Sequence, residues 1–252
     1  GKLRNYDSVS HAKTGTNLQS VRPFMDEFKV LDDPIKKEIT RHLNNSNYDA
    51  AKALARQHNS ALVKEIDNVQ NTLKKFESEL EDVLPDAKLI KEGFFPRYAT
   101  DYTGLTKTLG GAEKTQLKMA LRAVAKSRNK GVADLTEPER IDIINKIAQG
   151  YKISYANDKL QVITPAVKAI GKGSSPTKAR KIETVTPEMM PYYANADEAL
   201  SKYIRRATDF LEKKRFFGSK NMVVDDTGSL DINQSVAKLL NDELQKGNIT
   251  DE

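Results

Sequence analysis

The sequence predicts a mainly α-helical protein, an irregular helical bundle that contains one long heptad helix and one small β-hairpin. Three features indicate this fold. Apolar residues recur at spacings of three and four along most of the chain, one such run continues for three heptads, and alternation with a period of two occurs once. With 252 residues, the chain is long enough to bury a sizeable hydrophobic core.

The long heptad helix is expected at about residues 60–83. Its apolar residues alternate spacings of four and three, and they are Leu62, Ile66, Val69, Leu73, Phe76, Leu80 and Val83. A seam this narrow has to pack against other helices, which belong either to the same chain or to a second copy in a coiled coil. We favour packing within the chain, and Pro85 marks the end of the helix.

The hairpin is expected at about residues 151–163, where two alternating segments flank Asn157 and Asp158, a pair that favours a turn. The residues before it predict a helix that starts with a capping box, because Glu139 follows Thr136 by three positions. After the hairpin, a long helix is expected from about residue 195 to Gly218, followed by a last helix at about residues 231–246.

The chain divides into three expected segments. Residues 1–20 have few periodic apolar side chains and are expected to form a flexible N-terminal arm. Residues 21–150 are expected to form an N-terminal helical bundle. Residues 151–252 contain the hairpin, a basic loop at residues 168–181 and the C-terminal helices, and we expect them to pack on the preceding bundle as one domain.

Composition argues against several classes of chemistry. The absence of Cys excludes disulfides, thiol nucleophiles and Cys-based metal centres, and three His residues are too few for a multi-histidine centre. Glu77 and Glu81 share a helix face, which we interpret as solvated because no further ligand is placed beside them. No apolar run approaches the roughly 20 residues that span a bilayer. We expect no catalytic residues, no metal and no cofactor, and hence a protein that is not an enzyme.

An aromatic segment after the heptad helix is the first candidate site, and it consists of Phe94, Phe95, Arg97, Tyr98 and Tyr102. In one interpretation, the aromatic rings form a platform on which unpaired bases stack, with the guanidinium group on a phosphate. In the other, they fill the core between helices, and Arg97 pairs with an acidic residue such as Asp101. We favour the core interpretation, because four aromatic side chains are costly to expose together.

A basic region is the second candidate site. Residues 168–220 hold twelve Lys or Arg against six Asp or Glu, in a chain whose formal net charge is +6. The candidate phosphate-binding residues are Lys172, Lys178, Arg180, Lys181, Arg205, Arg206 and Lys213. Such a surface would bind DNA or RNA through the phosphate backbone without reading sequence. The alternative is a solvated face that neighbouring carboxylates neutralise.

Several short motifs occur in one order over about residues 25–250. They are Phe94-Phe95-Pro96-Arg97 with Asp101-Tyr102-Thr103-Gly104-Leu105, then Thr186-Pro187-Glu188-Met189-Met190-Pro191-Tyr192-Tyr193, then Tyr203-Ile204-Arg205-Arg206 and Lys214-Arg215-Phe216-Phe217-Gly218. Together they resemble a helical region of very large phage and prophage proteins, the polyvalent or internal virion polyproteins. The chain departs from that family's signature at Phe94, where the family has Tyr, and in the basic loop, which is longer here.

The resemblance implies a non-enzymatic helical module with a structural, interaction or delivery role in a virion protein. Its partners would be other domains of the parent polypeptide or other virion proteins, and its location would be the virion interior and then the host cytoplasm. We interpret both ends of the chain as excised from a longer protein, because the first residue is Gly rather than Met and residues 248–252 look like the start of another helix. A nucleic-acid-binding module that uses residues 168–220 is the alternative function.

Overall fold

The computed structural model describes residues 2–83, 95–148, 152–163, 184–221 and 232–246. The elements are α1 (Lys2–Lys29), α2 (Asp33–Asn44), α3 (Tyr48–His58), α4 (Ala61–Val83), α5 (Tyr102–Thr108), α6 (Gly111–Ser127), η1 (Val132–Asp134), α7 (Glu137–Ala148), β1 (Lys152–Ala156), β2 (Lys159–Ile163), η3 (Pro187–Tyr192), α8 (Ala196–Asn221) and α9 (Ile232–Gln245). Over this part of the chain, the fold is mainly helical with one antiparallel hairpin, as the sequence predicts.

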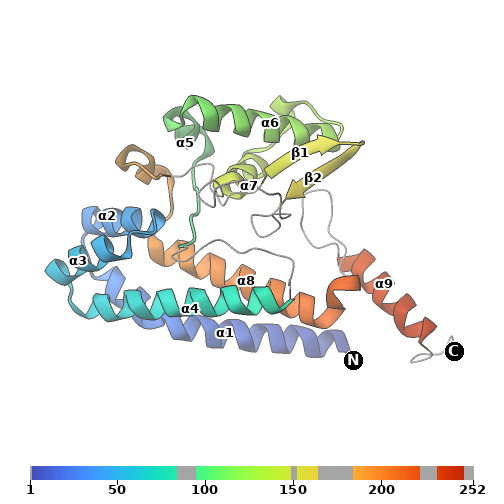
Figure 1. Cartoon of the computed structure of the whole chain (residues 1–252), viewed down its shortest axis with the longest axis horizontal. Helices are drawn as coiled ribbons and strands as arrows, with labels where there is room; N and C mark the ends of the chain where they lie inside the picture. Colours follow the sequence, from blue (N-terminus) through green and yellow to red (C-terminus); the bar gives the residue numbers. More distant parts are fainter. Residues whose placement is uncertain (1, 84–94, 149–151, 164–183, 222–231, 247–252) are drawn as a thin grey trace, which may run out of the picture.

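The helices are arranged in two layers (Figure 1). In one layer the long helices α1, α4 and α8 lie side by side, with α2 and α3 at one end. In the other layer α6 and α7 pack against the hairpin, and α5 contacts α7 and η3. Helix α9 contacts α8 and extends away from both layers at the opposite end from α2 and α3.

Each layer has its own hydrophobic core. The first core buries side chains of α1 to α4 and of α8, together with Phe95. The second core buries side chains of α5 to α7, of β1 and of η3. The two cores divide the chain differently from the expected boundary at residue 150, because α8 joins the first four helices while α5 to α7 join the hairpin.

The heptad helix is confirmed as α4, and its seam packs within the chain. Ile66 and Leu73 are 0% and 2% exposed, and Leu62, Val69 and Phe76 are buried with them. The helices that cover this seam include α1 and α8, which flank α4. The side chains of Leu80 and Val83, which complete the predicted seam, lie outside the described residues.

The flexible arm expected at residues 1–20 is corrected by the structure, in which α1 is helical from Lys2. Local propensity disfavours a helix here, because Gly15 costs about 1 kcal/mol relative to Ala and the neighbouring Thr14 and Thr16 are also weak helix formers. The helix is stabilised by docking: Phe24 and Phe28 are buried in the first core, and α1 lies along both α4 and α8.

Three local signals that the sequence contains are confirmed. The capping box forms, since the Thr136 amide donates to Glu139 Oε2 at 2.7 Å and the Glu139 amide donates to Thr136 Oγ1 at 3.4 Å. Asn157 and Asp158 have φ angles of 52° and 55°, as a two-residue type I′ turn requires. Gly218 has a φ of 71°, which interrupts the regular helical geometry of α8.

The buried seam of α4 yields a stability prediction. Ile66→Asp or Leu73→Asp should lower the free energy of unfolding by about 3 kcal/mol or more, because each places a carboxylate among apolar side chains. Asn71→Asp introduces the same group at an exposed position of α4 and should change it by about 0.5 kcal/mol or less. Thermal or urea unfolding measures both effects. Equal stability of the two kinds of variant would show that the seam is not a core.

Candidate functional site

The aromatic segment crosses between the two layers in an extended conformation, so its side chains point in different directions. Phe95, Pro96, Arg97 and Ala99 are buried, whereas Tyr98 is half-buried and Thr100 is exposed. Ala99 forms an isolated antiparallel bridge with Tyr193. Phe95 is 0% exposed in the first core, as the core interpretation predicts, and Phe94 lies outside the described residues.

The buried cation of this segment, Arg97, is 2% exposed and binds a backbone carbonyl. Its Nε donates to the carbonyl oxygen of Asn44 at 2.7 Å, and Nη2 donates to the same oxygen. Asn44 is the last residue of α2, where carbonyl groups lack helical partners and carry partial negative charge. The pairing of Arg97 with Asp101 is therefore corrected: the Asp101 carboxylate instead caps α5 by accepting from the Gly104 amide at 2.9 Å.

Two asparagine side chains near Arg97 also bond to backbone, and one of them joins the two layers. The Asn45 amide group donates to the Val185 carbonyl at 2.9 Å and accepts from the Val185 amide at 2.8 Å. Buried Asn145 exchanges hydrogen bonds with both backbone groups of Ala99 in the same way. We call these three side chains, Arg97, Asn45 and Asn145, the polar seam. Sequence analysis missed the two asparagines, because a bond from a side chain to distant backbone leaves no periodic signal.

Beside the polar seam, Tyr193 is a buried neutral phenol. Burial raises its pKa to about 12, although the positive charge of Arg97 acts in the opposite direction. A phenol with this pKa stays protonated at neutral pH. Tyr193 therefore brings no negative charge to Arg97 at neutral pH.

The remaining aromatic candidates occupy separate places. Tyr102 packs against the second core, where the Arg140 guanidinium lies 5.9 Å from its ring centroid. Tyr98 lies against α8, where Lys202 Nζ is 3.9 Å and Arg206 Cζ is 5.5 Å from the ring centroid. The predicted aromatic platform is thus divided among the first core, the second core and the surface of α8. Tyr98 is the described member that meets the basic region.

On α8, some cations pair with a carboxylate and others have none among the described residues. Lys202 binds Glu198 at 2.6 Å and Lys213 binds Asp209 at 2.7 Å, each one helical turn apart. Arg205 and Arg206 are exposed, and within the described residues neither has a carboxylate partner. We call Tyr98, Lys202, Arg205 and Arg206 the α8 cluster. The other candidates, Lys172, Lys178, Arg180 and Lys181, lie outside the described residues.

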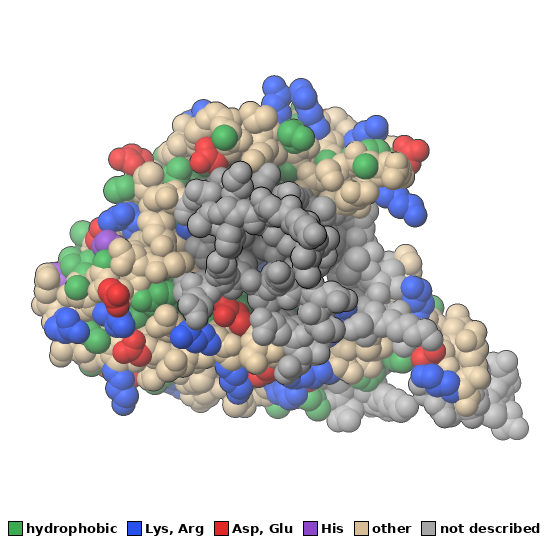
Figure 2. Space-filling view, viewed as in Figure 1, with side chains coloured by type: hydrophobic (Ala, Val, Ile, Leu, Met, Phe, Trp, Pro, Cys, Tyr) green, Lys and Arg blue, Asp and Glu red, His purple; other side chains and the backbone are tan. Residues whose placement is uncertain are grey.

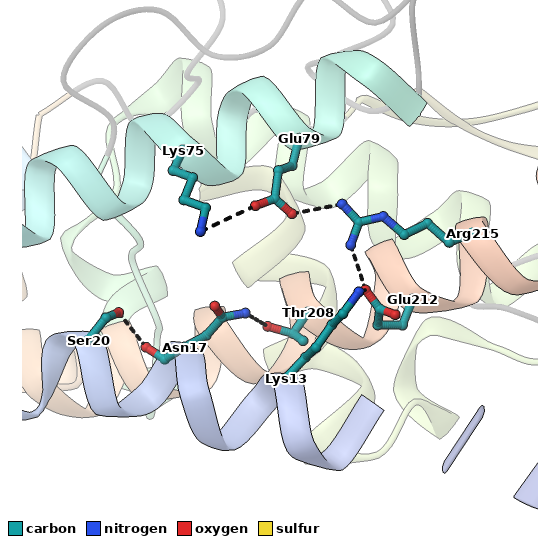
Figure 3. A network of polar contacts seen from close by, with 8 residues as sticks. All are labelled: Lys13, Asn17, Ser20, Lys75, Glu79, Thr208, Glu212 and Arg215. Carbon is teal, nitrogen blue, oxygen red and sulfur yellow. Dashed lines mark hydrogen bonds and ion pairs between the residues drawn. The ribbon is translucent and has the colours of Figure 1, made fainter. Parts of the chain in front are cut away.

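A charged network that sequence analysis did not find joins α1, α4 and α8 (Figure 3). Charges alternate along it: Lys75 Nζ lies 3.9 Å from Glu79, Glu79 binds Arg215 at 2.9 Å, and Arg215 binds Glu212 at 2.6 Å. Lys13 then binds Glu212 at 2.8 Å. These residues line a hollow of about 350 Å³ between the three helices.

Glu212 is the most enclosed member of this network, with a side chain only 7% exposed. Burial raises the pKa of Glu212, but the hydrogen bonds from Lys13 and Arg215 outweigh burial and hold the pKa below its usual range. The carboxylate is therefore ionised at neutral pH. Within the part of the chain that the structure describes, no group of three His, Asp or Glu side chains is arranged to hold a metal ion.

No protein-family model, curated protein or solved structure matches this chain. Its sites are therefore interpreted from their own geometry. Among the described helices, none combines the length and the apolar composition needed to cross a membrane.

The division of the aromatic segment predicts different roles for two neighbouring rings. Phe95→Ala should lower the free energy of unfolding by about 3–5 kcal/mol, because it removes a fully buried ring and leaves a cavity. Tyr98→Ala should cost about 1 kcal/mol, which is typical of partly exposed cation–π contacts. Chemical denaturation of both variants measures the difference. Similar losses for the two would contradict the assignment of Phe95 to the core and Tyr98 to the surface.

Proposed function

We propose that this chain is a non-enzymatic helical module with a structural or interaction role. The observation that supports the proposal is the polar seam, in which buried and half-buried polar side chains bond to backbone at the junction of the two layers. The resemblance of the sequence to phage internal virion polyproteins suggests the setting. There the module would lie in the virion interior, and then in the host cytoplasm, beside other domains of its parent polypeptide or other virion proteins.

We expect a module of this kind to hold its partners in fixed positions, and this requires the two layers to behave as one body. Arg97 is central because it lies between them and bonds to the end of α2, while Ala99, two residues further on, is held by Asn145 of α7. Each of these bonds satisfies a backbone group that burial would otherwise leave without a partner. The seam therefore couples the unfolding of the two cores.

Arg97→Ala tests this coupling. The substitution leaves a cavity and removes the donors to the buried Asn44 carbonyl, so we expect a loss of about 3 kcal/mol or more in the free energy of unfolding. Hydrogen exchange should accelerate by a similar factor in α4 and in α6, which belong to different cores. Arg122→Ala, at an exposed position of α6, is the control, and it should change the free energy of unfolding and the exchange rates little.

If exchange accelerates in one core alone, the layers unfold independently and the proposal of a single rigid module fails. If Arg97→Ala leaves hydrogen exchange unchanged in both cores, Arg97 does not hold the layers together.

A second candidate function, binding of a nucleic acid through its phosphate backbone, is favoured by the α8 cluster. Its two arginines have no carboxylate partner within the described residues, and Tyr98 offers an aromatic ring beside Arg206. On the face seen in Figure 2, Lys and Arg are interspersed with Asp and Glu, so binding would depend on a local cluster rather than on the overall charge. Contacts of this kind are independent of base sequence and weaken with salt.

The double variant Arg205→Gln, Arg206→Gln tests this second function. For duplex DNA, removing two phosphate contacts should reduce the magnitude of the log–log salt slope by nearly two units. Lys118→Gln, Arg122→Gln is the matched control, since it removes two exposed cations from α6 and should leave the slope unchanged. Fluorescence anisotropy with labelled oligonucleotides at several salt concentrations gives both slopes. No binding at low salt, or equal effects of the two double variants, would exclude the α8 cluster as a phosphate-binding site.

A further inference from the structure

The two halves of α1 are held to the rest of the protein by different interactions. Downstream, Val21, Phe24 and Phe28 are each at most 1% exposed in the first core. Upstream, among the described side chains of residues 8–17, Ser10 alone is buried, and the largest apolar side chain, Val9, is 39% exposed. The hydrophobic contribution that fixes the second half of α1 is therefore weak in the first half.

The upstream half is bound to α8 by polar contacts. Lys13 Nζ lies 2.8 Å from Glu212 Oε1, and Asn17 Nδ2 donates to Thr208 Oγ1 at 2.9 Å. The hollow lies between these contacts and α4. The three helices are therefore packed less closely here than around Phe24. The Lys13 side chain is 45% exposed, which leaves its ion pair open to screening by salt.

Loss of Lys13 would not leave Glu212 as an isolated buried charge. Breaking a buried ion pair is usually costly because one charge stays behind without compensation. Here Arg215 also binds Glu212, at 2.6 Å, and reaches across to Glu79 of α4 at 2.9 Å. In Figure 3, Arg215 lies between the two carboxylates, and Lys13 approaches Glu212 from α1. Helices α4 and α8 thus remain joined when α1 is absent from this end.

We propose that residues 8–17 of α1 form a detachable strap, which salt releases from α8 while the rest of the protein stays folded. Once released, the strap loses its helical conformation, because Gly15 and its Thr neighbours are weak helix formers and a segment this short is unstable alone. Release uncovers the groove between α4 and α8, including Thr208, Leu211 and Glu212. The inference is independent of the proposed function, since it concerns neither the polar seam nor the α8 cluster.

Hydrogen exchange measured by mass spectrometry on the whole chain tests the strap. In the unmodified protein, raising the ionic strength should accelerate exchange of residues 8–17 at least tenfold, and leave residues 21–28 within twofold. Lys13→Ala should produce the same acceleration of residues 8–17 at low ionic strength. Arg22→Ala is the matched control, because it removes an exposed cation from the downstream half of the same helix and should leave residues 8–17 unchanged.

Two outcomes would overturn the proposal. In the first, residues 8–17 and 21–28 exchange at rates that change together with salt, which means that α1 is released as a whole or not at all. In the second, Lys13→Ala and Arg22→Ala have equal effects on residues 8–17, which means that the Lys13–Glu212 pair does not hold the strap. The salt measurement needs no variant, so it decides the question even where a substitution lowers overall stability. Failure here leaves the polar seam and the α8 cluster untouched.

Discussion

A guanidinium group buried between two hydrophobic cores constrains much of this structure. Moving a charge out of water is costly, and Arg97 meets this cost by donating to the last carbonyl of α2, where the helix ends in partial negative charge. The bond fixes Arg97 to α2, and its neighbours reach different parts of the protein. Phe95 enters the first core, Ala99 meets Asn145, and Tyr98 lies against Lys202 of α8. One buried contact thus links the cores and also creates the surface cluster.

The three long helices show how one bundle can be held firmly at one end and loosely at the other. Near Phe24 and Ile66, α1 and α4 bury apolar side chains in a common core. At the other end, the same helices face each other with Lys13, Glu79 and Arg215 around a hollow. Apolar contacts lose area as soon as the helices separate, whereas ion pairs can be exchanged for water and salt at smaller cost. The difference in chemistry along α1 therefore becomes a difference in local stability.

The sequence was sufficient for the elements whose signals are local. The heptad spacing located α4, expected at about 60–83 and found at Ala61–Val83, and the paired Asn157 and Asp158 located the hairpin turn. The sequence was insufficient for α1, because its upstream half has low helix propensity. The partner of its Lys13, Glu212, is about 200 residues away in the chain. The polar seam and the meeting of Tyr98 with α8 were hidden for the same reason, since they depend on chain segments brought together by folding.

The net positive charge does not by itself show where the protein could bind phosphate, because this depends on the neighbours of each cation. Many of the described lysines lie one helical turn from a carboxylate, as Lys146 does with Asp142 and Lys213 with Asp209, and such pairs contribute little to a long-range field. What distinguishes the α8 cluster is the ring of Tyr98 beside Lys202 and Arg206. Arg205 and Arg206 are both exposed on α8, while Glu198 is engaged by Lys202. A phosphate that approaches α8 here meets two guanidinium groups that bind no carboxylate within the described residues, and this condition favours binding more than the total charge does.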